Sequence, residues 1–290
     1  MRVLASGEAA LPYDKLGLTE RNSKVLLECI NQPYGLVLVV GPTGSGKTTT
    51  LHSAISVINT PETKIWTAED PVEITQRGLR QVQVHPKIGF TFAAALRSFL
   101  RADPDVIMVG EMRDQETAEI GIESSLTGHL VFSTLHTNSA PETVTRLLDM
   151  ELDPFSFSDA ILCILAQRLC RRLCDCKQEY QPDRKELEDI IMEYGVEAFK
   201  KTGINPADIR LCKATGCPKC GDSGYKGRLG IHELLQGTDE MKTLIKRKSE
   251  IEAIRHQAIN DGMTTLKQDG ILKCFKGLTD LKEVRKVCIK

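Results

Sequence analysis

The sequence predicts an α/β protein built around a mostly parallel sheet. Short apolar runs alternate with amphipathic helical patterns between residues 25 and 148, and a glycine-rich loop joins one such run to the helix that follows it. Strands and helices that take turns along a chain favour a parallel sheet covered on both faces. The 290 residues are 41% hydrophobic and 27% charged, which is ordinary for a globular protein with a sizeable core.

Each element follows from a local pattern. Strands are predicted where apolar residues run together or alternate; they are 35–40, 64–68, 81–84, 106–109 and 130–135. Helices are predicted where apolar residues recur at the spacing of one helical face; they are 25–30, 51–58, 92–100, 117–126 and 141–148. The pattern changes after residue 159. Residues 165–177 and 212–228 are rich in cysteine and basic residues, 185–201 favour a surface helix, and the chain from Glu233 onward favours helices.

Residues 41–48 match the P-loop (Walker A) pattern G-x-x-x-x-G-K-[ST] and lie between a predicted strand and a predicted helix. Glycines let successive N–H groups of such a loop point at phosphate oxygens, and the helix N-terminus adds partial positive charge. Lys47 is expected to reach the β- and γ-phosphates of ATP, and Thr48 to hold Mg²⁺. The alternative is a glycine-rich turn without nucleotide. The residues expected to bind the nucleotide are Gly41, Pro42, Thr43, Gly44, Ser45, Gly46, Lys47, Thr48 and Thr49.

Carboxylates follow two of the predicted strands. Glu111 comes after the strand 106–109, and Glu69 and Glu73 belong to an acidic run after another strand. The carboxyl ends of strands form the edge where open α/β sheets bind ligands. Glu111 is therefore expected to polarise the attacking water or to bind Mg²⁺ through water, and Glu69 and Glu73 to serve Mg²⁺ or the lytic water. The alternatives are an ordinary surface glutamate and a solvated acidic turn.

Two histidines and two arginines are further candidates. His129 precedes the predicted strand 130–135 and His136 follows it, so His136 could sense the γ-phosphate at the sheet edge. The alternative is a histidine satisfied in the core or on the surface. Arg97 and Arg101 lie one helical turn apart and share a face. They could complete the site of a neighbouring subunit, as arginines do in phosphoryl transfer, or form salt bridges with nearby acidic residues.

Ten cysteines need an explanation, because the chain is expected to stay in the cytoplasm, where disulfides are rare. No apolar stretch approaches the roughly 20 residues of a membrane helix, and residues 1–10 lack the apolar region of a signal peptide. Four thiolates are expected to hold a structural Zn²⁺ ion; they are Cys174, Cys176, Cys217 and Cys220. Cys170 or Cys212 could replace one of them, since the first pair is spaced C-x-C. The alternative is unligated thiols.

These motifs together resemble the secretion ATPase superfamily over residues 11–287. Residues 33–51 resemble its P-loop region, 69–73 its acidic "Asp box", 96–111 its atypical Walker B region, and 127–129 with 133–136 its "His box". The paired cysteines that end in residues 224–233 point to one branch, the type IV pilus assembly (extension) ATPases and type II secretion ATPases (PilB/GspE type). Retraction ATPases of pili lack this cysteine insert and are therefore disfavoured.

The resemblance implies a RecA-like core, a homo-hexameric ring, Mg-ATP and structural zinc. It implies that Glu111 activates water, that Glu69 or Glu73 assists, and that arginines are contributed around the pocket. The implied function is ATP hydrolysis that powers assembly of type IV pili or type II secretion pseudopili. The implied partners are an inner-membrane platform protein and a cytoplasmic adaptor. The motor would thus work at the inner face of the cytoplasmic membrane and would reach the membrane only through its partners.

Four consecutive parts are expected along the chain. They are a linker and start of the core over 1–32, a RecA-like P-loop core over 33–165, a cysteine-rich zinc-binding segment over 166–232, and a helical C-terminal subdomain over 233–290. Members of the superfamily usually carry N-terminal domains, so domains upstream of residue 1 are expected to be missing from this chain.

Two other functions fit parts of the pattern. A nucleic-acid translocase or DNA-uptake motor can also be built on a RecA-like ring, but a net charge of −1 argues against direct contact with nucleic acid. A nucleotide-gated binding module would bind ATP without hydrolysis. Glu111 and the acidic run argue against such a module, because a protein that only binds ATP needs no group that activates water.

Overall fold

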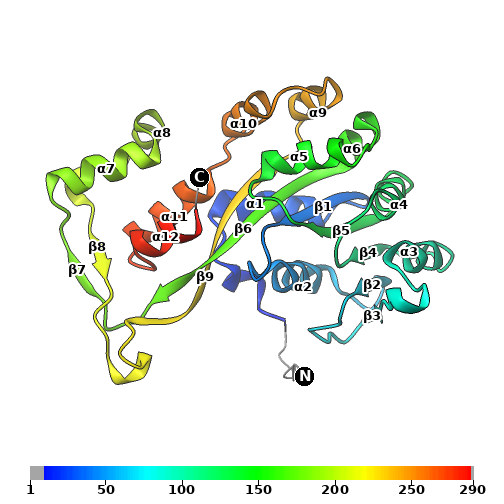
Figure 1. The fold of residues 1–290 in the computed structure, drawn as a ribbon, viewed down its shortest axis with the longest axis horizontal. Coiled ribbons are helices and arrows are strands. Elements are labelled where there is room, and N and C mark those ends of the chain that lie inside the picture. The colour runs from blue at the N-terminus through cyan, green and yellow to red at the C-terminus, as the bar shows by residue number, and fades with distance from the viewer. Residues whose placement is uncertain (1–9, 289–290) are drawn as a thin grey trace. The chain divides into compact units, whose positions relative to one another are not determined.

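The computed structural model describes residues 10–288 (Figure 1). The predicted segment 1–32 is thus described from residue 10, and the predicted subdomain 233–290 up to residue 288. The chain divides into two compact units. The first comprises the described residues up to Gln167 together with Leu234–Met263, and the second comprises Arg168–Glu233 together with the described residues from Thr264. Each unit therefore draws on two separate stretches of chain, whereas the sequence predicts consecutive parts.

A mostly parallel sheet forms the centre of the first unit, which confirms the predicted fold class. Its strands lie in the order β3 (Leu79–Gln83), β2 (Ile65–Glu69), β4 (Val106–Val109), β5 (Leu130–Leu135), β1 (Gly35–Val40), β6 (Ile161–Leu173) and β9 (Tyr225–Gln236). Every neighbouring pair from β3 to β6 is parallel. The carboxyl ends of these strands therefore meet at one edge, as expected for a doubly covered sheet.

Helices cover both faces of this sheet because neighbouring residues of each strand point to opposite sides. Leu36, Leu38 and Val40 of β1 belong to one core cluster, whereas Val37 and Val39 belong to the other. The first cluster includes residues of α3 (Phe92–Leu100), α4 (Gln115–Leu126), α5 (Ala140–Asp149), α6 (Pro154–Ala160), α9 (Asp239–Lys246) and α10 (Ile251–Asn260). The second includes residues of α1 (Glu20–Ile30) and α2 (Lys47–Ile58).

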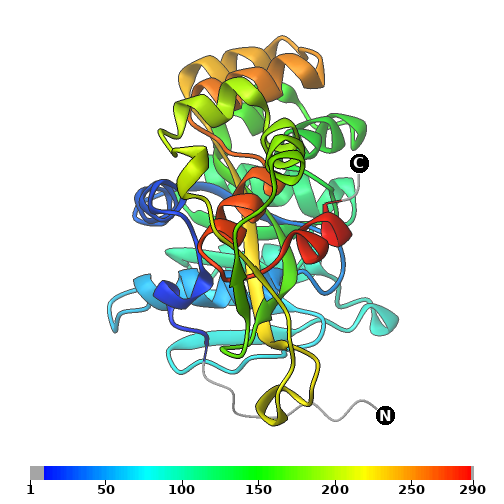
Figure 2. The same cartoon turned by 90° about the vertical axis from the view of Figure 1, so that its left-hand side faces the viewer.

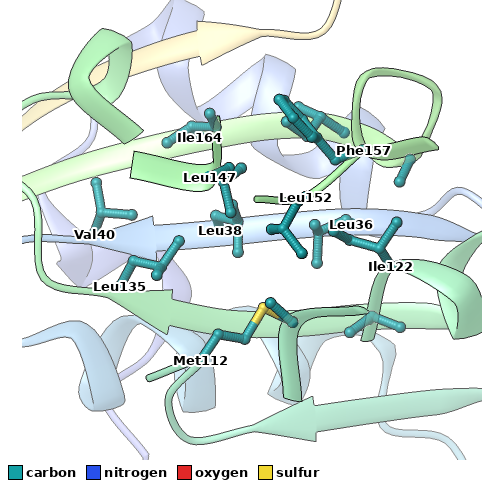
Figure 3. Packing of buried hydrophobic residues seen from close by; sticks show 14 of the residues in the cluster. Leu36, Leu38, Val40, Met112, Ile122, Leu135, Leu147, Leu152, Phe157 and Ile164 are labelled. Atoms are coloured by element: carbon teal, nitrogen blue, oxygen red, sulfur yellow. The ribbon is translucent and has the colours of Figure 1, made fainter. Parts of the chain in front are cut away.

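The first core cluster is visible from close by in Figure 3. Leu147, at the end of α5, and Leu152 and Phe157, which follow it, lie over Leu36 and Leu38 of β1. All five side chains are at most 4% exposed. Burial on both faces explains why β1, β4 and β5 are continuous apolar runs, and why the sequence predicts the bounds of these three strands as the structure has them.

The second unit has its own core. It contains the antiparallel pair β7 (Gln178–Tyr180) and β8 (Leu211–Lys213) and the helices α7 (Arg184–Tyr194), α8 (Val196–Lys201), α11 (Leu266–Phe275) and α12 (Leu281–Val287). The single surface helix predicted over 185–201 is wrong, because Gly195 separates α7 from α8. Gly195 has φ 94°, and its N–H donates to the carbonyl oxygens of Ile191 and Met192, which ends α7.

The sequence does not predict β6, α6 or β9. β6 begins with the apolar run 161–166 but continues through Gln167 and exposed arginines in its second half, so the whole strand shows neither one continuous apolar run nor a regular alternation. β9 likewise begins in an exposed, glycine-containing segment and ends in a buried one. None of the helices within residues 10–288 combines the length and the apolar character that a membrane span requires.

Candidate functional site

The loop between β1 and α2 is a phosphate-binding loop in shape. Gly41, Gly44 and Gly46 have φ values of 152°, 79° and 87°, which residues with a Cβ rarely adopt. Lys47 is the first residue of α2, and its Nζ donates to the carbonyl oxygens of Gly41 at 2.8 Å and Pro42 at 3.1 Å. The ammonium group thus stays with the loop at the N-terminus of α2, where its charge adds to the helix dipole. Such a site suits a phosphate chain.

Gln167 of β6 holds this loop in place. Its Nε2 donates to the carbonyl oxygen of Ser45 at 2.6 Å, and its Oε1 accepts from Thr50 Oγ1 at 2.7 Å. The side chain is buried, so both hydrogen bonds are shielded from water. Gln167 is not among the residues predicted from the sequence, because β6 is not predicted either. The available signal was a polar residue directly after the run of apolar residues 161–166.

Gly41→Ala is expected to destabilise the protein more than Gly44→Ala. A Cβ on Gly41 would lie 2.5 Å from the Gln167 carbonyl oxygen and 2.6 Å from Ser45 Oγ, whereas a Cβ on Gly44 would meet no atom within 4 Å. The expected losses in the free energy of unfolding are about 3 kcal/mol for Gly41→Ala and about 1 kcal/mol for Gly44→Ala. Urea denaturation without nucleotide measures both. Equal losses would contradict the close approach of backbone at Gly41.

Glu111 lies at the same edge of the sheet, just after β4. Its Oε1 is 2.9 Å from His136 Nε2, and its Oε2 accepts from Arg113 Nε at 2.6 Å. The side chain of Glu111 is 14% exposed, while those of Arg113 and His136 are 60% and 44% exposed. Arg113 also approaches Asp70 Oδ2 at 4.0 Å. The structure therefore brings Glu111 and His136 together at the edge of the sheet where the P-loop lies. His136 and Arg113 orient the Glu111 carboxylate.

Glu69, at the end of β2, is in a different environment. It is 2% exposed; its Oε1 accepts from Thr67 Oγ1 at 2.7 Å and Gln81 Nε2 at 3.0 Å, and its Oε2 lies 3.2 Å from His52 Nε2. Burial alone would raise the pKa of Glu69, but the hydrogen bonds from His52, Gln81 and Thr67 outweigh it and hold the pKa below its ordinary value. Glu73, in contrast, is exposed. The two carboxylates that were predicted to serve Mg²⁺ or the lytic water thus have different surroundings.

The other predicted residues lie apart from this edge. His129 precedes β5 and therefore lies at the amino ends of the strands, where its ring Nδ1 is 3.0 Å from the carbonyl oxygen of Ser124. Arg97 and Arg101 are exposed on α3 and at its end. Arg97 forms an ion pair with Glu116 at 2.7 Å, and Arg101 lies 3.4 Å from Ser98 Oγ. Both arginines face solvent within this chain.

Four thiols gather in the second unit. Cys174 and Cys176 follow β6, and Cys217 and Cys220 lie in the loop between β8 and β9 (Figure 2, yellow). The four Sγ atoms lie within 4.8 Å of one another. The Sγ–Sγ distance is 3.9 Å for Cys174 and Cys217 and for Cys176 and Cys220, and it is 3.7 Å for Cys217 and Cys220. Tetrahedral Zn–S bonds of about 2.3 Å place the sulfur atoms about 3.8 Å apart, so these residues fit a zinc ion.

Backbone groups support the cluster further. The N–H groups of Cys217 and Gly224 donate to Cys220 Sγ at 3.2 and 3.3 Å, an arrangement that favours a thiolate. The two alternative cysteines have other surroundings: Cys170 Sγ donates to the Leu229 carbonyl oxygen at 3.5 Å, and Cys212 lies against Gly277. The predicted four-cysteine cluster is therefore present, in the combination without Cys170 and Cys212.

The fold, the residues at the P-loop edge of the sheet and the four thiols together define a class of protein. The chain is an α/β protein with a RecA-like P-loop core and a tetracysteine insert. It belongs to the Type II/IV secretion system protein family, whose family model matches residues 1–286.

Similar curated proteins show which branch of this family the chain resembles. The chain is 47% identical over 285 residues to the type IV pilus assembly ATPase PilB of Myxococcus xanthus, covering 98% of this chain and 49% of that protein. It is 44% identical over 288 residues to the type II secretion system ATPase E of Vibrio cholerae, covering 99% and 55%. The chain thus spans about half the length of the curated relatives it matches. The predicted resemblance to this branch is confirmed.

Solved structures show the same fold. The crystal structure of the pilus retraction motor PilT with bound ADP has a TM-score of 0.70 and 29% identity, covering 98% of this chain and 68% of that chain. The ATPase DotB of Legionella pneumophila has a TM-score of 0.68 at 21% identity, covering 96% and 65%.

Proposed function

We propose that this chain is the motor part of an ATPase that powers assembly of type IV pili or of type II secretion pseudopili. The observation that carries the proposal is the meeting of the P-loop and Glu111 at one edge of the sheet. The named relatives support the pilus or secretion role, and the four-thiol insert agrees with the extension branch. The two alternative functions, a DNA motor and a nucleotide-gated binding module, have no comparable support from the named relatives.

The reaction is in-line attack of water on the γ-phosphate of ATP. Lys47 and the N-terminus of α2 bind the phosphates, and Glu111 accepts a proton from the attacking water. His136 and Arg113 orient the Glu111 carboxylate through the contacts at 2.9 and 2.6 Å. Thr48 supplies the hydroxyl that holds Mg²⁺, which when bound offsets the developing negative charge. Glu73, like Asp70, is an exposed residue of the acidic run, whereas Glu69 is buried.

Assembly of six copies would complete the site. Because Arg97 and Arg101 are exposed on α3, they can face the nucleotide of a neighbouring copy in a homo-hexameric ring. The ring would act in the cytoplasm, at the inner face of the cytoplasmic membrane, on an inner-membrane platform protein and with a cytoplasmic adaptor. Zn²⁺ held by the four thiols would fold the cysteine-rich loops.

ATP hydrolysis measured against chain concentration tests this function. Turnover per chain is expected to rise steeply and then level off, because each site needs a neighbour. Lys47→Ala, the control, is expected to show no turnover at any concentration, since the phosphates lose their cation.

Turnover per chain that does not change with concentration would contradict the shared site. ATP bound without turnover at every concentration would favour the binding module, and strong stimulation by DNA at low salt would indicate a translocase.

A further inference from the structure

A network of five side chains, three of them buried and two half-buried, joins the P-loop helix to the end of β2. His52 lies on α2 one turn after Thr48, and it is 0% exposed. Its ring contacts Gln76 and Glu69, and Glu69 contacts two more side chains. The members are His52, Thr67, Glu69, Gln76 and Gln81. Of these, only His52 and Glu69 can ionise, so the protonation of one pair decides the charge inside the network.

Backbone groups fix which way the two glutamine amides point. Gln76 Nε2 donates to the carbonyl oxygen of His52 at 3.2 Å, so Gln76 Oε1 is the atom that faces the ring. Gln81 Oε1 accepts from the backbone N–H of Gln76 at 2.8 Å, so Gln81 Nε2 faces the carbonyl oxygen of Ile74 and Glu69 Oε1. Exchanging oxygen and nitrogen in either amide would set acceptor against acceptor and donor against donor.

The ring of His52 therefore meets an acceptor on both sides. Nδ1 is 2.8 Å from Gln76 Oε1, and Nε2 is 3.2 Å from Glu69 Oε2. The ring thus connects Gln76 to Glu69 and places α2 next to the end of β2. Without His52, Glu69 Oε2 would be a buried acceptor that lacks this partner.

The same contacts leave Glu69 no free face. Oε1 accepts two hydrogen bonds, from Thr67 and Gln81, and Oε2 faces His52. The backbone beside Glu69 is in close contact with the residue before Glu111, because Gly110 N donates to Ala68 O at 2.8 Å. A Cβ on Gly110 would lie 3.5 Å from Glu69 Cα. A change in the position of Glu69 would therefore be transmitted to Glu111 through the backbone.

We propose that His52 is a positioning residue, which together with Gln76 and Gln81 holds Glu69 against the P-loop helix and so fixes Glu111 relative to the P-loop, while Glu69 itself contacts neither water nor Mg²⁺ in the reaction. The inference rests on the proposed ATPase function. The nearest charged neighbours have other partners: Lys47, on the same helix, bonds to the loop carbonyls, and Asp70 faces Arg113.

Glu69→Gln tests the role of Glu69 against Glu111→Gln as the matched change at the next strand. In Glu69→Gln the new amide oxygen can still accept from Thr67 and Gln81, and the new N–H can donate to the ring of His52, so each contact of the side chain has a counterpart. The kcat of ATP hydrolysis is expected to fall by no more than about fivefold, against about a hundredfold or more for Glu111→Gln. Equal, large losses in the two variants would overturn the proposal.

Wild-type turnover separates this proposal from the proposed function. Absent wild-type turnover would refute the ATPase function, whereas normal wild-type turnover with equal, large losses in Glu69→Gln and Glu111→Gln would refute only the role given to Glu69.

A rescue experiment separates positioning from packing. His52→Phe leaves Glu69 Oε2 buried without its partner, so kcat is expected to fall at least about tenfold with a smaller change in KM. Adding Glu69→Gln removes the buried charge and is expected to recover most of kcat. Unchanged kcat in His52→Phe, or no recovery in the double variant, would contradict a role through Glu69.

Discussion

Glu111→Gln is expected to lower the kcat of ATP hydrolysis by about a hundredfold or more while ATP binding stays nearly unchanged. The amide keeps the size of the side chain and can still bond to His136 or Arg113, but it cannot accept the proton of the attacking water. Binding of ATP depends on the P-loop and Lys47, which the change does not touch. Turnover and the dissociation constant of a fluorescent ATP analogue measure the two effects separately.

Glu119→Gln is the control for this change. Glu119 is an exposed residue of α4 whose Oε1 accepts from Gln115, so its substitution removes the same charge away from the P-loop edge. It is expected to retain wild-type turnover. Near-normal turnover in Glu111→Gln, in protein whose Lys47→Ala variant is inactive, would remove Glu111 from its proposed role.

Removal of zinc is expected to unfold the loops that carry the four thiols. The binding free energy of a four-thiolate zinc site is about 10 kcal/mol or more, comparable with the whole stability of a domain of about 5–15 kcal/mol. One zinc ion per chain is expected in purified protein, and almost none in Cys217→Ser/Cys220→Ser. Elemental analysis measures the metal, and limited proteolysis between residues 174 and 224 measures the unfolding.

Cys212→Ser is the control for the zinc prediction. Cys212 is buried in the same unit but lies outside the four-thiol cluster, so its substitution is expected to leave the zinc content unchanged. Wild-type protein with far less than one zinc ion per chain would contradict the site. Loss of zinc in Cys212→Ser would mean that the ligand set is a different one.

Much of the fold follows from patterns within short runs of consecutive residues. β1, β4 and β5 are apolar runs because they are buried on both faces, and the glycines of the P-loop carry their conformation with them. The acidic end of β4 and the four cysteines are equally local signals. Their chemistry depends on residue type and spacing, so these parts of the candidate site can be predicted from the sequence.

Other parts depend on residues that are distant in the chain. Thr50 and Gln167 are 117 residues apart and form one hydrogen bond. The contacts by which Gln167 holds the P-loop could therefore be found only once the structure placed β6 beside β1. His129 and His136 are close in sequence, but a strand of six residues separates them, which puts them at opposite edges of the sheet. Sequence spacing alone does not show which edge a residue reaches.

The sequence by itself thus determined the fold class, the P-loop and a carboxylate that follows β4, because each is encoded in a short run of residues. It also indicated a cysteine cluster, but the structure decided that Cys170 and Cys212 lie outside it. Only the tertiary structure decided that Glu69 is a buried, saturated carboxylate and that His52 faces two acceptors. The physical reason is that burial and hydrogen-bond partners are properties of the packed chain: the same glutamate would be a solvated acid if α2 and the segment before β3 did not close over it.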